Sequence, residues 1–450
     1  MESNSRDGFS SKIGVIAAAA GSAIGLGNIW RFPYIIGDNG GGAFLIVYLL
    51  CVLTLGIPIM IGEFALGRIS RVNAIATFRK LAPKSIFSIV GYIGLLSAFC
   101  ILSFYGVVAG WCFSYILKSL SGAFNNLTPD KADLIFNNLV SGGFEPIFWQ
   151  VAFMFLTGFI VLFGIKNGIE KYSKILMPLL FIIIIILDIR ALTLANANDG
   201  LSFLFKFDFS KITLNTIFMA LGQAFFSLSV GMGTMITYGS YISKKENLLT
   251  TSLNVAFADT LVAVLAGIAI FPAVFTFNID PSSGAGLAFI SLPMVFSKMF
   301  MGNIFACLFF ILLLVAGLTS SISILEVIVA FLCEDFNISR KKVTILTTVV
   351  VSLSGVICSL SNGFMKINLF NQSYMDFLNY LSSNFLLPLG AILISVFLGY
   401  YFDKKLFVKE LTNDGEIKLP FEKLLFFLFK FFIPFIISII FLQNLNIIKL

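Results

Sequence analysis

Three acidic residues lie inside long apolar stretches of the sequence: Glu63, Asp259 and Glu326. A carboxylate near the centre of a bilayer costs about 3 kcal/mol or more, so each of these residues needs a partner or a function. No basic residue is near Asp259 in the sequence, so a bound cation is its natural partner. The alternatives are a protonated carboxyl group or a position near the membrane surface. Glu63, which precedes Gly67 and Arg68, and Glu326 are expected to form structural pairs.

Two glycine-containing segments interrupt apolar stretches in a similar way. Residues 21–28 read Gly-Ser-Ala-Ile-Gly-Leu-Gly-Asn, and residues 227–234 read Ser-Leu-Ser-Val-Gly-Met-Gly-Thr. Glycine costs about 1 kcal/mol in a helix interior, so paired glycines beside serines predict that each helix unwinds there. Unwound backbone offers carbonyl oxygens to a cation and helix N-termini to an anion, and these groups must line a cavity because lipid cannot satisfy them. The alternative is a helix-packing face of small residues.

The elements that must position these residues are apolar stretches of about 20 residues, each long enough to cross a bilayer. Of the 450 residues, 58% are hydrophobic and only 12% are charged, which a water-soluble protein of this length could not accommodate. The predicted fold is an all-α membrane protein with eleven transmembrane helices, at residues 13–37, 42–66, 87–118, 148–165, 172–192, 214–240, 250–277, 303–333, 342–361, 374–402 and 421–444.

The two interrupted stretches are the first and the sixth of these spans. Their separation predicts an inverted repeat of five plus five spans, in which discontinuous helices 1 and 6 form a site near the middle of the membrane, as in secondary transporters. The predicted divisions are an N-terminal tail (1–12), a first repeat (13–192), a second repeat (214–402) and an extra span (421–444).

Basic residues predict the orientation of the spans. With the N-terminus in the cytoplasm, most of the 30 lysine and arginine residues fall in cytoplasmic loops, and eleven spans then place the C-terminus outside. The net charge of +7 is therefore a topology signal, and no nucleic-acid partner is expected. The apolar stretch after Lys12 is too short before its alanines for a cleaved signal peptide. Heavy use of Phe, Ile, Asn and Lys suggests an AT-rich bacterial genome, and hence the inner membrane of a bacterial cell.

The composition argues against catalysis. The sequence has no histidine, which is the usual general base near neutral pH and the commonest metal ligand. The six cysteines are scattered and form no Cys-x-x-Cys pair, so they are expected to pack as small hydrophobic residues. Gly-x-Ser-x-Gly and paired metal-ligand motifs are also absent from the sequence. An intramembrane enzyme is therefore not expected, and no residue is assigned a catalytic role.

Four motifs resemble those of a known family. Residues 20–33 read Ala-Gly-Ser-Ala-Ile-Gly-Leu-Gly-Asn-Ile-Trp-Arg-Phe-Pro, residues 39–44 read Asn-Gly-Gly-Gly-Ala-Phe, and residues 316–321 read Ala-Gly-Leu-Thr-Ser-Ser. Together with the stretch from Pro58 through Glu63 to Arg68, they resemble the neurotransmitter:sodium symporter family, and the resemblance runs over residues 8 to 440. Eleven spans and short loops are similar to its bacterial members, which have the leucine-transporter fold.

The resemblance implies two sodium sites, both built from the oxygen ligands that hard cations prefer. The first would use the backbone carbonyl of Ala23, the side chains of Asn28, Ser227 and Asp259, and the substrate carboxylate. The second would use the carbonyls of Gly21, Ile24 and Ala316 and the hydroxyl groups of Thr319 and Ser320. Many members have asparagine at the position of Asp259. An acid there could supply the negative charge that chloride supplies in animal members, so no chloride is expected.

The resemblance also implies the substrate contacts. Tyr105 resembles the tyrosine that bonds the substrate carboxylate, and Phe226 resembles an aromatic lid. Monoamine-transporting members carry an aspartate where this chain has Gly25, so an amino acid is expected in place of a monoamine. The other implied contacts are Ser22, Ala23, Gly27, Ile101, Ser227, Ser229, Met232, Ser320 and Ile324. This lining is mostly apolar, and methionine is flexible, which favours an aromatic or large aliphatic L-amino acid, with an aromatic one preferred.

Two gates are implied as well. The outer gate would be formed by Arg31, Asp376 and Gln223, and the inner gate by Arg6, Glu334 and Tyr241. The expected function is sodium-coupled import by alternating access, with an amino acid and membrane lipid as partners. The alternatives are a channel, although a Thr-Val-Gly-Tyr-Gly type filter is absent from the sequence, and a non-transporting amino-acid sensor, although no cytosolic output domain is present.

Overall fold

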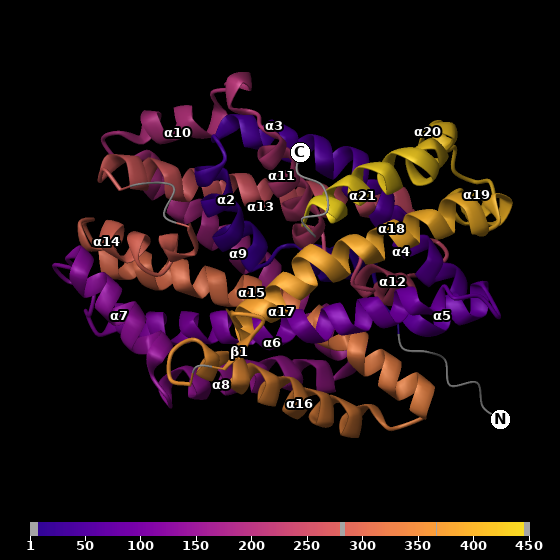
Figure 1. The fold of residues 1–450 in the computed structure, drawn as a ribbon, viewed down its shortest axis with the longest axis horizontal. Coiled ribbons are helices and arrows are strands. Elements are labelled where there is room, and N and C mark those ends of the chain that lie inside the picture. Colours follow the sequence, from indigo (N-terminus) through magenta and orange to yellow (C-terminus); the bar gives the residue numbers. More distant parts are fainter. Residues whose placement is uncertain (1–7, 280–283, 366, 445–450) are drawn as a thin grey trace.

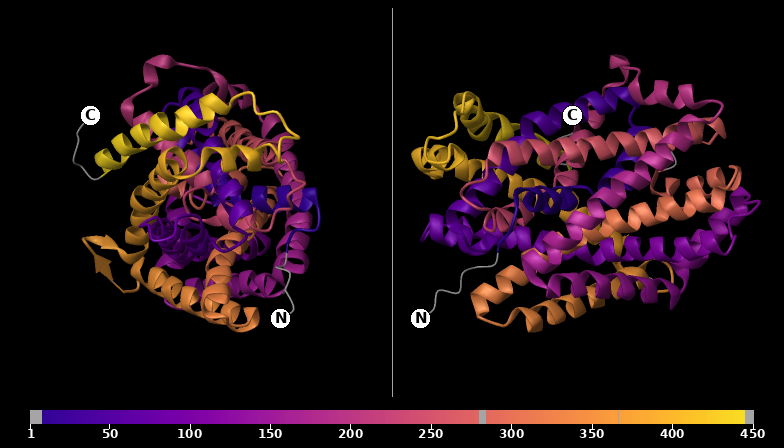
Figure 2. Two further views of the ribbon diagram at one scale, coloured as in Figure 1. Left: turned by 90° about the vertical axis from the view of Figure 1, so that its right-hand side faces the viewer. Right: turned by 180° about the vertical axis from the view of Figure 1, so that it is seen from behind.

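The computed structural model describes residues 8–279, 284–365 and 367–444, and this part of the chain is almost entirely helical (Figure 1). Its only strands, β1 (Asn368–Leu369) and β2 (Gln372–Ser373), form a short antiparallel hairpin. The end-on view in Figure 2 shows the helices packed as a bundle, from whose rim the hairpin projects. The prediction of an all-α fold is confirmed.

Nine continuous helical stretches of the described chain are long and apolar enough to cross a membrane. Several contain a π-helical turn, labelled η, through which the helix continues. The nine stretches are α3 (Gly42–Cys51) with η2 (Val52–Gly56) and α4 (Ile57–Ser70); α6 (Ser88–Leu120); α8 (Glu145–Leu162); η3 (Ile165–Glu170) with α9 (Lys171–Leu192); α13 (Leu248–Thr276); α15 (Gly302–Phe336); α16 (Arg340–Ser361); α17 (Tyr374–Tyr380) with η6 (Leu381–Leu386), α18 (Leu387–Val396) and η7 (Phe397–Tyr401); and α20 (Glu422–Phe427) with η8 (Leu428–Phe432) and α21 (Ile433–Asn444). Each of them overlaps a predicted span.

The first and sixth spans are broken. In the first, α1 (Lys12–Ala23) is followed by η1 (Gly27–Arg31) and α2 (Phe32–Asp38), with a bend of 48° between the two parts. In the sixth, α11 (Leu214–Ser227) and α12 (Thr234–Gly239) are separated by residues 228–233, which are not helical. Both breaks fall in the glycine segments that predict them. By length and composition the described chain has nine spans, or ten with the bent pair, and a count of eleven requires that α11 and α12 form one span.

Short helices that the apolar pattern did not predict cover both ends of the bundle. In Figure 1, α5 (Ala74–Leu81) and α19 (Lys404–Leu411) lie at one end, and α7 (Pro129–Ser141), α10 (Ala197–Phe205) and α14 (Ser291–Ser297) lie at the other. The 3-10 turns η4 (Phe209–Lys211) and η5 (Gly284–Leu287) lie in connections. Local capping explains some of these helices. The Asn73 side chain, for example, accepts hydrogen bonds from two N–H groups in the first turn of α5.

The two broken spans lie in the interior of the bundle. α15 packs along α6, and α1 lies against both α15 and α13. On the outer faces, large apolar side chains such as Phe155, Ile182 and Leu353 are exposed. An apolar exterior of this kind is what helices that face lipid require, and it leaves the interior as the place where polar groups can gather.

A buried arginine in α4 joins two connecting segments at the α5/α19 end of the bundle. Arg68, in α4, is 1% exposed and forms an ion pair with Glu410 of α19. It also donates to the carbonyl oxygens of Glu246 and Glu410, at 2.5 and 2.6 Å, and to Asn413 Oδ1 at 2.9 Å. Arg68 therefore fixes two connecting segments onto α4.

Candidate functional site

The break in span one exposes backbone groups to the interior. Ile24 leaves the helical conformation, with φ −71° and ψ 103°. The Leu26 N–H donates to the hydroxyl group of Tyr105 at 2.7 Å, and the Gly25 N–H donates to Asn28 Oδ1 at 3.1 Å. Side chains thus satisfy backbone donors that the helix has released, as burial requires.

The break in span six depends on glycine. Ser229, Gly231 and Gly233 have φ values of 53°, 84° and 80°, in the left-handed region. A Cβ atom at Gly231 would lie 2.7 Å from the carbonyl oxygen of Leu387, so a side chain does not fit there. The Gly231 N–H donates to Glu63 Oε1 at 2.6 Å. Glu63 therefore satisfies a backbone donor of the break.

A cavity of about 270 Å³, the central cavity, lies between the two breaks, α6 and α15. Eleven of the twelve residues predicted to contact a substrate line it: Ser22, Ala23, Gly25, Gly27, Ile101, Tyr105, Phe226, Ser229, Met232, Ser320 and Ile324. The twelfth, Ser227, is buried and bonded to Asp259. Because the eleven residues come from segments far apart in the sequence, the fold assembles this lining.

The central cavity has a polar part and an apolar part. A Cβ atom at Gly25 would lie 2.4 Å from the Tyr105 hydroxyl and 2.5 Å from Ser320 Oγ, so this end is narrow and surrounded by hydroxyl groups. Hydroxyl groups beside an unwound helix end can bind a carboxylate. Ile101 and Met232 line the apolar part, which suits a hydrophobic side chain.

Asp259 is fully buried at the centre of a hydrogen-bonded cluster. Asn28 Nδ2 donates to Asp259 Oδ1 at 2.8 Å and to Ser227 Oγ at 3.0 Å, and Ser227 Oγ donates to the same carboxylate at 2.8 Å. Tyr48 Oη donates to Asp259 Oδ2 at 3.2 Å. No lysine or arginine in the described ranges forms an ion pair with Asp259. Ala23, the remaining member of the first predicted sodium site, lines the adjacent central cavity.

Tyr48 is a member of this cluster that the sequence analysis missed. It lies in α3, is fully buried, and packs against Phe32 and Phe44. The available signal was the one tyrosine of an apolar span, because a buried phenol requires a hydrogen-bond partner.

The second predicted set of oxygen ligands also comes together. Ser320 Oγ donates to the carbonyl oxygens of Gly21 and Ile24, both at 3.2 Å. Thr319 Oγ1 donates to the carbonyl oxygen of Ala316 at 3.0 Å. α15 thus presents hydroxyl groups to the unwound end of α1. Carbonyl and hydroxyl oxygens in this arrangement fit a hard cation.

A further cavity of about 480 Å³, the vestibule, lies against α2 and α17. Tyr105 and Phe226 line both the vestibule and the central cavity. Arg31 and Asp376 also line the vestibule, but they do not form an ion pair with each other. The Arg31 guanidinium lies 4.6 Å from the centre of the Phe226 ring, and Asp376 accepts a hydrogen bond from Ser373 Oγ at 2.7 Å.

Gln223, the third residue of the predicted outer gate, is also close to the first break. Its Nε2 donates to the carbonyl oxygen of Gly27 at 2.7 Å, and its Oε1 is buried without a hydrogen-bond partner in the described chain. Gln223 thus connects α11 to the start of η1.

The predicted inner gate is only partly described. Arg6 lies outside the described residues. Tyr241 Oη donates to Glu326 Oε1 at 2.8 Å, and Arg340 forms an ion pair with the same carboxylate. Glu334 accepts a hydrogen bond of 2.7 Å from the backbone N–H of the residue that caps α5. Glu326 therefore has the structural ion pair that its position predicts.

Two broken helices facing a cavity inside an apolar bundle define a class of protein, the secondary membrane transporters. The chain belongs to the sodium:neurotransmitter symporter family, whose sequence model matches residues 6–132 and 140–449. The family resemblance carried by the motifs is thereby confirmed.

Relatives cover nearly the whole chain. It is 39% identical over 442 residues to the uncharacterized sodium-dependent transporter YhdH of Bacillus subtilis (strain 168), and 40% identical over 452 residues to an uncharacterized sodium-dependent transporter of Haemophilus influenzae, with 98% of both chains covered in each case. The structure is similar to the crystal structure of MhsT in complex with L-phenylalanine, with a TM-score of 0.90 and 41% identity, covering 98% of this chain and 100% of that chain. The protein is therefore a multi-span transporter of a sodium-dependent family, which is not a family of enzymes.

Proposed function

We propose that this chain is a sodium-coupled symporter that imports a hydrophobic L-amino acid, with an aromatic side chain preferred. The observation that carries the proposal is the central cavity, whose Gly25 end suits a carboxylate and whose walls suit an apolar side chain. An aspartate at position 25, which would bind an amine, has no room beside Tyr105 and Ser320. MhsT, which has a similar fold, was crystallised with L-phenylalanine, and this supports an aromatic substrate.

The two predicted sets of sodium ligands, here called the first and second oxygen clusters, support the co-transport of two sodium ions. The first cluster joins span one to α13, through the Asn28–Asp259 hydrogen bond, and the second joins it to α15, through Ser320. A sodium ion in either cluster would hold the unwound end of α1 against the bundle. Because the same unwound segment lines the central cavity, ion binding and substrate binding would stabilise each other.

The carboxylate of Asp259 supports transport that needs no chloride. Two sodium ions and a zwitterion place positive charge in a buried site, and a fixed negative charge there offsets part of it. The hydrogen bonds from Asn28, Ser227 and Tyr48 orient this carboxylate towards the first break.

Alternating access would be controlled at the two ends of the site. Arg31, Asp376 and Gln223 would close the vestibule, and Arg31 and Asp376 already face it from opposite elements. Arg6, Glu334 and Tyr241 would close the other end. In this proposal the N-terminus is cytoplasmic, the C-terminus is outside, and the protein lies in a bacterial inner membrane. Its two halves, residues 13–192 and 214–402, would be the inverted repeats that move against each other, with 421–444 as an added span.

Binding of radiolabelled L-phenylalanine to the purified protein, with and without sodium, tests this proposal. We expect sodium-dependent, saturable binding that large hydrophobic L-amino acids displace and that tyramine, a monoamine, does not. Binding that is unchanged in choline would reject the coupling to sodium. Counterflow into proteoliposomes preloaded with unlabelled substrate separates a symporter from the alternatives, because a channel or a sensor of the same fold does not exchange labelled for unlabelled substrate.

A further inference from the structure

The carboxylate of Glu170, the last residue of η3, lies against the start of α1. Its side chain is 1% exposed and accepts three hydrogen bonds from the two residues that precede α1. Oε2 accepts from the Ser10 N–H at 2.7 Å, and Oε1 accepts from Ser10 Oγ at 2.7 Å and from Ser11 Oγ at 2.9 Å. Lys174 Nζ, one turn further along α9, donates to Oε1 at 2.5 Å. The carboxylate thus ties the start of span one to the start of span five.

The first turn of α1 is adapted to this contact at two positions. Ser11 is the N-cap residue, and its Oγ accepts from the Gly14 N–H at 3.1 Å while it donates to Glu170, so the carboxylate orients the cap. A negative charge beside a helix N-terminus is also favourable to the helix dipole. A Cβ atom at Gly14 would lie 2.1 Å from Glu170 Oε1, so the close approach of the carboxylate requires glycine there.

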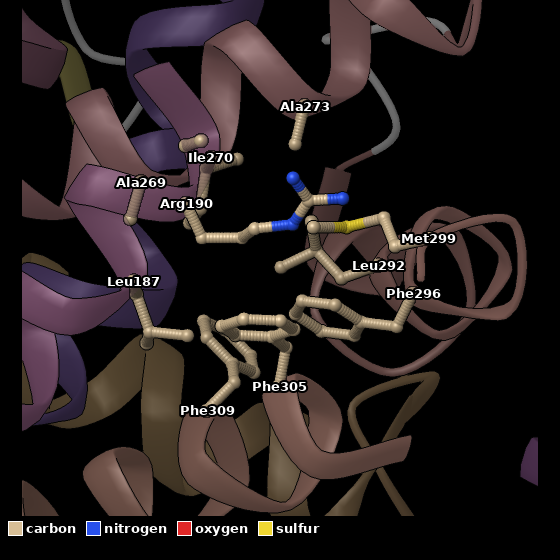
Figure 3. Close-up of a pocket in the computed structure, with 11 residues that line it drawn as sticks. Leu187, Arg190, Ala269, Ile270, Ala273, Leu292, Phe296, Met299, Phe305 and Phe309 are labelled. Atoms are coloured by element: carbon tan, nitrogen blue, oxygen red, sulfur yellow. The ribbon is translucent and has the colours of Figure 1, made fainter. Parts of the chain in front are cut away.

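The two helices that Glu170 joins are held to different degrees. At the far end of α9, the Arg190 side chain extends over phenylalanine rings of α14 and α15 (Figure 3), and its guanidinium carbon lies 5.7 Å from the centre of the Phe305 ring. The first turn of α1 is packed less closely, because Lys12 is exposed and Ile13 is 72% exposed. α9 is therefore the fixed element, and Glu170 holds the beginning of α1 against it.

The other end of α1 carries ligands of the second oxygen cluster. The carbonyl oxygens of Gly21 and Ile24 accept hydrogen bonds from Ser320 there. α1 has 12 residues and is therefore about 18 Å long. Because a helix this short moves as one body, a displacement of its start away from α9 would also move these carbonyl groups relative to α15. The Glu170 contact and the ion ligands thus lie at opposite ends of one rigid element.

We propose that Glu170 is a positioning residue for alternating access, which holds α1 against α9 while the ion sites are occupied and releases it when the site opens at the inner gate. This inference rests on the proposed symport function. The contact is separate from the predicted inner gate, to which the same segment is joined by the Phe9 N–H, a donor to the Tyr241 carbonyl oxygen at 3.3 Å. After release Glu170 keeps Lys174 as its partner, which limits the cost of losing the serine donors.

Hydrogen–deuterium exchange of the full-length protein in detergent, measured by mass spectrometry of peptides from α1, tests the assignment. Glu170→Gln replaces one acceptor oxygen by an amide donor that faces serine donors, and should speed exchange of α1 about tenfold or more without sodium. Saturating sodium should slow this exchange again. The sodium concentration for half-maximal L-phenylalanine binding should rise, with maximal binding unchanged. Exchange of α13 and α15 should stay the same, which separates a positioning role from a loss of overall stability.

Glu145→Gln is the matched control, because Glu145 also bonds a serine and a lysine, Ser114 and Lys118, but these belong to α6 instead of α1. If Glu170→Gln does not fold, Gly14→Ala decides, since its Cβ atom would displace the Glu170 carboxylate and should produce the same changes. Unchanged exchange of α1 in the deciding variant would overturn the proposal. Wild-type binding that is indifferent to sodium would reject the symport function instead, and exchange of α1 would still report on the Glu170 contact.

Discussion

The side-chain amide of Asn28 donates a hydrogen bond of 2.8 Å to the carboxylate of Asp259. This contact joins the unwound part of span one to the middle of α13, and both residues are fully buried. Because no described lysine or arginine pairs with Asp259, its charge is available to a cation that also contacts Asn28.

Asn28→Leu should weaken sodium-dependent substrate binding severely and raise the sodium concentration required by about tenfold or more. The substitution replaces a ligand oxygen with a methyl group and removes one of the three side chains that donate to Asp259. Sodium titrations of L-phenylalanine binding measure the effect. Asn303→Leu is the matched control, because its amide bonds to Asn125 away from both cavities. Unchanged sodium dependence in a folded Asn28→Leu protein would remove Asn28 from the ion site.

Wild-type uptake should be the same in chloride and in gluconate, because the fixed charge of Asp259 replaces a solution anion. Asp259→Asn should lose activity or become sensitive to chloride. Asp188→Asn, which neutralises a buried aspartate outside both cavities, should remain indifferent to chloride. The measurement is initial uptake into proteoliposomes in each anion, and a wild type that requires chloride would refute the role given to Asp259.

Gly25→Ala should abolish most substrate binding, because its Cβ atom would lie 2.4 Å from the Tyr105 hydroxyl and 2.5 Å from Ser320 Oγ. Gly25→Asp should be at least as damaging, since its carboxylate would repel that of the substrate in a site with little water. Gly222→Ala is the control for the added methyl group, because the Cβ position there meets no described atom within 4 Å apart from the neighbouring residues and backbone of its own helix. Normal affinity in Gly25→Ala would show that this end of the cavity does not hold the substrate.

Arg68→Ala should lower the free energy of unfolding by roughly 3–5 kcal/mol, since it leaves Glu410 and two carbonyl groups in a buried site without their donor. Lys409→Ala, which breaks an exposed pair with Asp414 near α19, should cost only about 0–1 kcal/mol. Thermal unfolding of the two variants in detergent compares them. Equal melting temperatures would show that the Arg68 network does not hold α19 in place.

The apolar spans and the two breaks could be predicted because each follows from a local pattern. A stretch of twenty apolar residues can form few structures other than a membrane span. A Gly-x-Gly sequence beside serines weakens a helix wherever it occurs. The short helices α5, α7, α10, α14 and α19 could not be predicted from the same pattern, because capping and packing at the ends of the bundle determine them.

Partners distant in the sequence were the hardest to predict. The sequence marks Asp259 as a residue that needs a partner, but it does not show that Tyr48, some two hundred residues earlier, donates to it. It likewise does not show that Arg68 pairs with Glu410, or that Arg31 stacks on Phe226 while Asp376 bonds to Ser373. These contacts depend on how the helices pack, and only the three-dimensional structure contains that information.

Uptake of radiolabelled L-phenylalanine into proteoliposomes measures whether sodium drives the import of an amino acid. Two sodium ions moving with a zwitterion carry net charge, and each ion contributes about 2.3 kcal/mol at a potential of 100 mV. We therefore expect uptake above the equilibrium level in an inward sodium gradient, a further rise with an inside-negative potential, and none in choline. Uptake that persists unchanged when choline replaces sodium would show that sodium does not drive the import.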